Sequence, residues 1–105
     1  MIRIARADDA AQVAAIYAPS VTASATSFEY TPPDAVEMAA RIASNLAYAP
    51  YLVSDVGGGL LGFAYAAKHR DRAAYQWSVD VSVYIHERAR RQGVGRALYL
   101  SLIHI

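Results

Sequence analysis

The most regular pattern in the chain is an alternation of apolar and polar residues from Gln76 to Ile85. A period of two over ten residues predicts a β-strand with one face in the core and the other toward solvent or a ligand. Asp80 lies in the middle of the polar face. The apolar positions are Trp77, Val79, Val81, Val83 and Ile85, and the polar positions are Gln76, Ser78, Asp80, Ser82 and Tyr84.

A short alternating stretch at residues 2–6 predicts another strand, and a helical pattern follows it. Asp8 and Asp9 are suited to cap this helix, because Gln12 follows Asp9 at the spacing of a capping box. The helix is expected to end near Pro19, since proline interrupts the helical hydrogen bonds.

Residues 20–33 are rich in Ser, Thr and Pro and have no helical period, so they predict a loop long enough to contribute to a site. Pro32 and Pro33 suit the first turn of a second helix that ends before Pro50. The apolar stripe expected to face the core consists of Val36, Ala39, Ala40, Ala43 and Leu46.

Two apolar stretches at residues 50–56 and 60–69 flank a run of three glycines and predict a β-hairpin. A last helix is expected to start near Gly93 or Val94 and to face the sheet with Val94, Leu98 and Leu102. The order is β-α-α-β-β-β-α, with no linker or internal repeat. We therefore predict one α/β domain over residues 1–105, with a mainly antiparallel sheet and flanking helices.

The composition is that of an ordinary globular domain, with 105 residues, 55% hydrophobic and 18% charged. A net charge of +1 gives no reason to expect nucleic-acid binding through bulk charge. There is no cysteine, which excludes disulfides and thiolate metal sites, and no histidine pair has metal-ligand spacing. Acidic residues near the N-terminus and the lack of a long apolar stretch predict a cytoplasmic protein that does not bind membranes.

Four arginines surround two glycines in the stretch ERARRQGVGRAL, residues 87–98. A strand, a glycine-containing turn and a helix in this order leave backbone N–H groups free at the helix N-terminus, where anions bind. Gly93 and Gly95 lack the β-carbons that would keep a phosphate away from the backbone. Two interpretations stay open, a diphosphate cradle and a glycine-containing helix start with solvated arginines.

The segment RRQGVGRAL after VSVYI resembles the acetyl-CoA signature of the GCN5-related N-acetyltransferases (GNAT), Arg/Gln-x-x-Gly-x-Gly/Ala. The longer stretch AYQWSVDVSVYIHERARRQGVGRALY resembles the phosphinothricin acetyltransferase branch of this superfamily. IRIARADDAAQVAAIY, SFEYTPP, YLVSDV and GFAYA match in the same order. The resemblance implies a GNAT-like acyl-CoA N-acyltransferase fold, acetyl-CoA as co-substrate and no metal.

The resemblance also implies which residues bind the co-substrate. The backbone of Val83, Tyr84 and Ile85 would pair with the pantetheine arm of CoA. The diphosphate would be held by Arg90, Arg91, Gln92, Gly93, Val94, Gly95 and Arg96.

Asp80 occupies the position of a glutamate that is the proposed general base in related enzymes. A protonated amine must lose a proton before it attacks a thioester, so a nearby carboxylate is useful. Because Asp is one methylene shorter than Glu, proton transfer through a water is expected. From the residue pattern alone, an exposed aspartate or one bonded to a neighbouring serine is the alternative.

The residues expected at the acceptor site are Phe28, Arg70, Arg72 and Tyr75. Phe28 and Arg72 match family residues at that site, and Arg70 lies two residues before Arg72. Tyr75 falls in the matched segment, and its alternative is a packing role. A guanidinium at Arg72 would bind the carboxylate or phosphinate of an amino-acid-like substrate. The alternatives are solvated loop arginines and a small satellite core around Phe28.

The family pattern continues beyond Ile105 with a further strand that forms the other wall of the cofactor cleft. We therefore expect the chain to be incomplete at its C-terminus, with residues 101–105 as a doubtful tail. The predicted function is acetyl transfer to the primary amine of a small substrate of the phosphinothricin or methionine sulfoximine type. A non-catalytic CoA-binding module and an inactive fragment are the alternatives. Dimerisation is common in this branch, which leaves a homodimer of a longer parent protein open.

Overall fold

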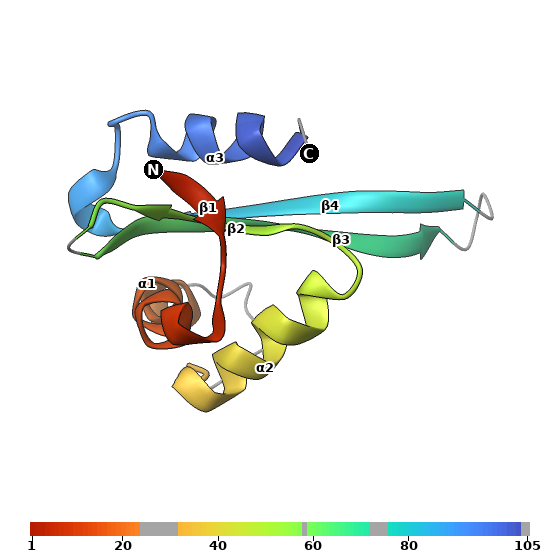
Figure 1. Cartoon of the computed structure of the whole chain (residues 1–105), viewed down its shortest axis with the longest axis horizontal. Coiled ribbons are helices and arrows are strands. Elements are labelled where there is room, and N and C mark those ends of the chain that lie inside the picture. Colours follow the sequence, from red (N-terminus) through yellow and green to blue (C-terminus); the bar gives the residue numbers. More distant parts are fainter. Residues whose placement is uncertain (24–31, 58, 72–75, 104–105) are drawn as a thin grey trace.

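The computed structural model describes residues 1–23, 32–57, 59–71 and 76–103. Four antiparallel strands form one sheet in the order β1-β2-β3-β4. Helices α1 and α2 cover one face of the sheet and α3 covers the other (Figure 1). The elements are β1 (Ile2–Ile4), the 3₁₀ turn η1 (Ala7–Asp9), α1 (Ala10–Ala23), α2 (Ala35–Leu46), β2 (Tyr51–Asp55), β3 (Leu60–Asp71), β4 (Gln76–Ile85), the 3₁₀ turn η2 (Glu87–Ala89) and α3 (Val94–Ile103).

The sheet separates two hydrophobic clusters, because successive residues of a strand point to opposite faces. On β2, Val53 packs toward α1 and α2, whereas its neighbour Leu52 packs toward α3. The larger cluster contains Val13, Ile16, Met38, Ile42, Tyr51, Val53 and Phe63, among others. The smaller one consists of Leu52, Ala64, Ala66, Leu98 and Leu102. Both faces of the sheet are therefore buried.

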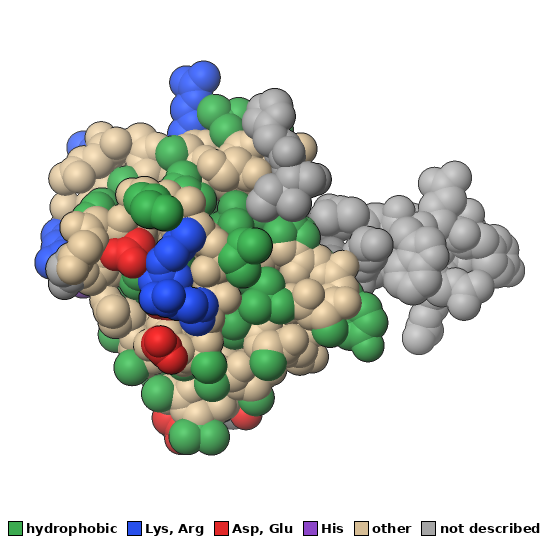
Figure 2. Space-filling view, in the orientation of Figure 1, with side chains coloured by type: hydrophobic (Ala, Val, Ile, Leu, Met, Phe, Trp, Pro, Cys, Tyr) green, Lys and Arg blue, Asp and Glu red, His purple; other side chains and the backbone are tan. Residues whose placement is uncertain are grey.

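The predicted fold class and element order are confirmed. Strand β4 has the predicted bounds, and α3 begins at Val94 and buries Leu98 and Leu102 against the sheet. No helix in the described ranges is long and apolar enough to cross a membrane. In the space-filling view, basic side chains of this face lie beside acidic ones and do not form one patch (Figure 2).

The predicted end of the first helix is wrong. Helix α1 continues through Pro19 to Ala23, so the following loop begins later than residue 20. The proposed capping box with Gln12 is also absent, since the Gln12 Oε1 atom accepts a hydrogen bond from the Leu60 N–H at 2.8 Å. That contact joins α1 to β3, and it has no signal in the local sequence.

The predicted apolar stripe of the second helix is wrong as well. Val36 is 79% exposed, whereas Met38 and Ile42 are buried against the sheet. Asp34, and not a proline, begins the helix, because its Oδ1 atom accepts a hydrogen bond from the Glu37 N–H at 2.8 Å. Two large apolar residues one helical turn apart, Met38 and Ile42, mark the buried face, and of the predicted stripe Ala39 packs against the same cluster. The alanines of that stripe occur on both faces of the helix.

The polar face of β4 is only partly as predicted. Tyr84, one of its members, packs into the larger cluster, with its ring centroid 5.1 Å from Phe63 and 5.2 Å from Tyr17. Val83 and Ile85 pack against the smaller cluster under α3. At its C-terminal end, β4 is therefore covered on both faces. Tyr84 fits on the covered face because a tyrosine ring can pack while its hydroxyl remains near solvent.

Gly62 lies at the closest approach of β3 and β4. A β-carbon at this position would be 2.8 Å from both the Tyr84 carbonyl oxygen and the Ile85 Cδ1 atom. We expect Gly62→Ala to lower the free energy of unfolding by about 1–3 kcal/mol, as overpacking does. Urea unfolding measures this loss. Gly95→Ala is the matched control, because its nearest contact would be 3.6 Å and alanine favours the helix, so its stability should not decrease.

A buried ion pair joins the first strand to η1 and β2. The Arg3 guanidinium donates to both Asp9 carboxylate oxygens, at 2.9 and 2.8 Å, and to Asp55 Oδ2 at 3.0 Å. Asp9 also accepts a hydrogen bond from the Arg6 N–H at 2.7 Å and is only 3% exposed. The hydrogen bonds from Arg3 are the largest cause of a lowered pKa at Asp9. The charge of Asp9 therefore stabilises the folded state.

Candidate functional site

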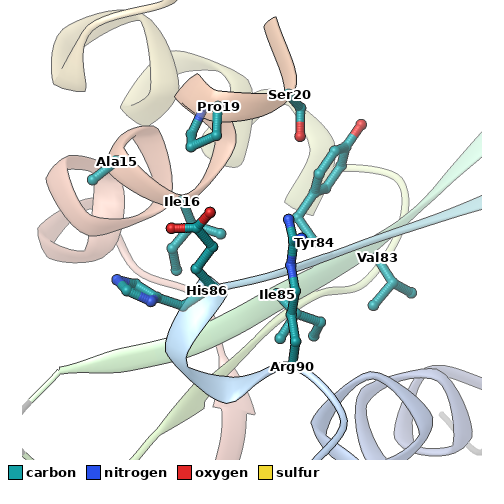
Figure 3. A pocket seen from close by; sticks show the side chains of 10 residues that line it. Ala15, Ile16, Pro19, Ser20, Val83, Tyr84, Ile85, His86 and Arg90 are labelled. Atoms are coloured by element: carbon teal, nitrogen blue, oxygen red, sulfur yellow. The ribbon is translucent and has the colours of Figure 1, made fainter. Parts of the chain in front are cut away.

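A cavity of about 490 Å³ lies between the second half of α1 and the end of β4. Its wall is formed by Ala15, Ile16, Pro19 and Ser20 on α1, by Val83, Tyr84 and Ile85 on β4, and by His86, Glu87 and Arg90 after that strand. Figure 3 shows Pro19 and Ser20 on one side of the cavity and Val83, Ile85 and Arg90 on the other. The structure thus brings four of the predicted cofactor residues, Val83, Tyr84, Ile85 and Arg90, into one cavity.

The edge of β4 that adjoins this cavity carries free backbone groups. The His86 N–H donates to the Leu61 carbonyl at 2.7 Å, and the register then places Tyr84 opposite Phe63. In an antiparallel pair, every second residue bonds to the partner strand and those between point away from it. Tyr84 is therefore bonded to β3. The N–H and C=O groups of Val83 and Ile85 point to the edge that has no partner strand in the described sheet.

This register changes the role expected for Tyr84. Its backbone faces β3, so its side chain, which lines the cavity, is the part available to a ligand. The backbone pairing expected for Val83 and Ile85 agrees with the direction of their free groups. An extended ligand with amide groups would bind to this edge as an additional strand does.

The turn between η2 and α3 has a backbone suited to an anion. Arg91 and Gly93 both have a positive φ, 66° and 79°. The first intrahelical bond of α3 runs from the Ala97 N–H to the Gly93 carbonyl at 3.0 Å. The N–H groups of Val94, Gly95 and Arg96 precede it and have no intrahelical acceptor. No side chain in the described part of the chain caps them, so they remain available to an anion.

The two glycines of the motif have different structural causes. Gly93 has open space around the position of a β-carbon, and its positive φ is the reason for glycine. A β-carbon on Gly95 would point toward the Ile85 and Val83 side chains, at 3.6–3.8 Å. The expectation that Gly95 clears a path for phosphate is therefore corrected, because this position faces the sheet.

The arginines of the motif do not share one position. The Arg90 side chain lines the cavity and extends past Ile85 toward Tyr84 (Figure 3). Arg91 and Arg96 are exposed and do not line it. Gln92 donates from Nε2 to the Arg88 carbonyl at 3.2 Å, so it stabilises the turn. Arg90 is thus the arginine that is placed between the strand edge and the helix N-terminus.

No pattern in the sequence pointed to the α1 wall of the cavity or to His86. Pro19 has no N–H, so the helix has no donor for the Ala15 carbonyl, and both residues line the cavity. The His86 Nδ1 atom accepts a hydrogen bond from the Arg88 N–H at 3.2 Å. This contact caps η2, and in the neutral ring it places the proton on Nε2.

The side chains of the remaining predicted site residues lie outside the part of the chain that the structure describes. Phe28, Arg72 and Tyr75 lie outside the described residues. Asp80 pairs with Ala67 and Arg70 pairs with Trp77 in the strand register, but their side chains are outside the described part. Their proposed roles stay predictions.

The acetyltransferase (GNAT) domain family matches residues 2–105 of the chain. Phosphinothricin N-acetyltransferase of Alcaligenes faecalis is 50% identical over 103 residues, which are 97% of this chain and 52% of the relative. The L-amino acid N-acyltransferase of Escherichia coli is 35% identical, with 97% of this chain and 60% of the relative covered. The chain spans about half the length of the curated relatives it matches.

Solved structures agree with this match. A phosphinothricin acetyltransferase of the GNAT superfamily from Sinorhizobium meliloti, in complex with acetyl-CoA, is 37% identical with a TM-score of 0.84. The match covers 99% of this chain and 57% of the other. An acetyltransferase from Salmonella typhimurium with acetyl-CoA is 30% identical, with a TM-score of 0.86 and coverages of 99% and 61%.

Proposed function

Because the chain belongs to the GNAT acetyltransferase family, we propose that the protein transfers an acetyl group from acetyl-CoA to the primary amine of a small amino-acid-like substrate. Phosphinothricin and methionine sulfoximine represent the proposed substrate class. The observation that carries this proposal is that the uncapped N-terminus of α3 lies beside the free edge of β4, since a β-carbon on Gly95 would face Ile85 and Val83 at 3.6–3.8 Å. We call these backbone groups together the CoA path, and Arg90 lines the cavity beside them.

The path fits the two chemically different parts of CoA. The pantetheine arm has amide groups, which pair with outward N–H and C=O groups at Val83 and Ile85. The diphosphate is an anion, which the N–H groups of Val94, Gly95 and Arg96 and the helix dipole favour. Arg90 adds a charge-assisted hydrogen bond. The side chains of Arg91 and Arg96 would supply charge from the solvent side.

The proposed catalytic step uses other groups of the same strand, β4. Asp80, which precedes Val83 by three residues, would take a proton from the bound ammonium group, through a water because the aspartate side chain is short. The neutral amine would then attack the thioester carbonyl carbon, the C–S bond would break, and the proton lost by the attacking nitrogen would end on the released CoA thiolate. A backbone N–H of β4 near Val83 would stabilise the negative charge that develops on the carbonyl oxygen.

The acceptor would be bound by the four residues expected at its site. Phe28 and Tyr75 would contact its side chain, and Arg70 and Arg72 would pair with its carboxylate or phosphinate group. The names of two curated relatives, a phosphinothricin N-acetyltransferase and an L-amino acid N-acyltransferase, support an amino-acid-like acceptor.

Calorimetry with CoA tests the binding part of the proposal. Alanine at a positive φ costs about 1–2 kcal/mol, so the turn in the free Gly93→Ala chain would relax to another geometry. Because CoA needs the original turn, we expect this variant to bind CoA about tenfold more weakly. Gly95→Ala should bind CoA as the unaltered chain does, because its β-carbon would point toward Ile85. Unchanged affinity in the Gly93→Ala variant would contradict the proposed role of this turn, and a loss in the Gly95→Ala variant would show that the added β-carbon obstructs the ligand.

Release of free thiol from acetyl-CoA in the presence of phosphinothricin tests the transfer. CoA binding without thiol release for any of a panel of small primary amines would leave a non-catalytic CoA-binding module. If the unaltered chain gives no heat with CoA under conditions in which a longer relative binds it, the proposal fails for this chain.

A further inference from the structure

Strand β4 is the long open edge of the sheet. The strand order is β1-β2-β3-β4, so one edge is β1, with three residues, and the other is β4, with ten. A long edge strand presents free N–H and C=O groups that can pair with another chain. Proteins protect such edges with short strands, lysine, proline or bulges. The β1 edge is protected because it is short, whereas β4 is not.

The other protective features do not occur in β4 either. The sequence from Gln76 to Ile85 contains no lysine, arginine, proline or glycine, and Asp80 is its one charged residue. The pairing with β3 continues without a shift of register from Gln76, opposite Asp71, to Ile85, opposite Gly62. No bulge therefore interrupts β4, and its edge is available for pairing along its whole length.

The free backbone groups of this edge belong to the odd-numbered residues of β4. The even-numbered residues, such as Tyr84, bond to β3, so the residues between them direct their N–H and C=O groups outward. Val81 lies at the middle of the outward set. The members of this set are all apolar, and they are Trp77, Val79, Val81, Val83 and Ile85.

An apolar surface borders the edge on the α3 side of the sheet. Val83 packs against the cluster under α3, and Val81, two residues before it, shares that face and is 36% exposed. A β-carbon on Gly95 would face Val83, so this flank of α3 lies next to β4. Tyr99 and Ile103 continue the flank about one and two turns later, and they are 46% and 53% exposed. Because α3 runs opposite to β4 (Figure 1), the flank follows the strand toward its middle.

We propose that two copies of this chain pair through β4 and form a dimer with one continuous antiparallel sheet. A two-fold axis at Val81 places every outward residue opposite an outward residue of the second copy. Val81 then lies opposite Val81, Val79 opposite Val83, and Trp77 opposite Ile85. The contact is the same patch on both chains, so it closes at two copies.

The charges distinguish this register from its neighbour. A two-fold axis at Asp80 would use the strand to a similar extent, but it would place two carboxylates directly opposite each other, which destabilises a strand pair. With the axis at Val81, Asp80 lies opposite Ser82 of the second copy. Both α3 helices then lie on the same face of the joined sheet, and their apolar flanks, with Tyr99 and Ile103, border the seam from both sides. The dimer thus covers the apolar surface as well as the strand edge.

The dimer and CoA use some of the same backbone groups. Val83 and Ile85 belong to the CoA path, and in the dimer their N–H and C=O groups pair with the second copy. The two forms of the chain therefore exclude each other. This consequence rests on the proposed function, whereas the dimer itself does not.

Size exclusion with light scattering, over a range of chain concentrations, tests the dimer. The mass of the unaltered chain is expected to rise toward twice 11.4 kDa. Val81→Lys and Val81→Glu should each weaken dimerisation by about tenfold or more, because each places two like charges at the axis. Val36→Lys is the matched control, since Val36 is 79% exposed on α2, and it should dimerise as the unaltered chain does.

An equal mixture of the Val81→Lys and Val81→Glu chains tests the position of the axis. Opposite charges then face each other, so at low ionic strength the mixture should dimerise more tightly than either variant alone. Such recovery also requires that both variants fold. Tyr99→Lys, at an exposed position of a helix, gives a variant that does not alter β4, and it should weaken dimerisation by about tenfold.

The proposal is overturned if the unaltered chain has a mass of 11.4 kDa at every concentration, which would leave the edge to a strand of a different protein. A mixture that dimerises no better than its folded components, judged by far-UV circular dichroism, would overturn it as well. If the Val81 variants do not fold, dimerisation of Tyr99→Lys at the affinity of the unaltered chain would contradict it.

Addition of CoA to the unaltered chain tests the shared groups. CoA is expected to convert the dimer to the monomer. If calorimetry shows that CoA binds while the dimer persists, the CoA path is wrong, and the dimer is still supported by the mixture. If CoA does not bind, the proposed function fails for this chain, and the mixture alone decides about the dimer.

Discussion

Replacing Asp80 with alanine is expected to lower kcat for acetyl transfer by about 10²- to 10⁴-fold, the usual contribution of a general base. The affinity for CoA should stay unchanged, because Asp80 precedes the residues proposed to hold CoA. Thiol release under saturating acetyl-CoA measures the first quantity, and calorimetry with CoA measures the second.

Asp80→Glu provides the conservative comparison. Glutamate extends the carboxylate by one methylene and is the residue that related enzymes carry, so this variant should keep or raise kcat. Asp8→Ala, at an exposed position on η1, is the control for loss of one acidic charge. Unchanged turnover in the Asp80→Ala variant would exclude Asp80 as the base and leave the catalytic proposal without its proton acceptor.

Replacing Asp9 with alanine is expected to lower the free energy of unfolding by about 2–3 kcal/mol, because the Arg6 N–H and the Arg3 guanidinium, which keeps its bond to Asp55, both lose an acceptor. The Asp9 side chain is 5% exposed and that of Arg3 is 18% exposed, so solvent screens this pair only weakly. In a domain of this size the loss corresponds to a decrease in Tm of about 10–20 °C. Asp8→Ala, the exposed neighbour, should change Tm little.

The same ion pair predicts a pH dependence. The pKa of Asp9 in the folded protein lies below its usual value of 3.8, mainly because Arg3 donates hydrogen bonds to its charged form. Its stabilisation is therefore complete above that value and is lost as the pH falls through the lowered pKa. Urea unfolding between pH 7 and pH 2 should show this loss in the unaltered chain and a smaller one in the Asp9→Ala variant. Parallel curves would contradict the assignment.

The elements with a strong local pattern were predicted well. The ten-residue alternation fixed β4 at both ends, and the spacing of Val94, Leu98 and Leu102 fixed the buried face of α3. The buried face of helix α2 was not predicted, because alanines occur on several of its faces and give little indication of which face is buried. The aromatic residues of β2 and β3 decided that choice, since they face Met38 and Ile42.

The candidate site was predictable where it lies within one continuous stretch. Residues 83–96 form the end of a strand, a turn and the start of a helix. The motif can be recognised there because its geometry depends on residues that are neighbours in the sequence. The α1 wall could not be predicted, since Pro19 suggested the end of a helix and instead lies inside it. The reasons for glycine at positions 93 and 95 could not be predicted either. At Gly93 the reason is a positive φ, and at Gly95 it is a contact with β4.

The sequence by itself determined the order of elements, the extent of β4 and the family resemblance, because periodicity and short-range motifs depend on neighbouring residues. Only the tertiary structure decided which backbone groups of β4 are free and which arginine lines the cavity. These properties depend on strand register and on packing between segments that are far apart in the chain. No local pattern encodes them, because a change of one residue in the register would reverse every one of these directions.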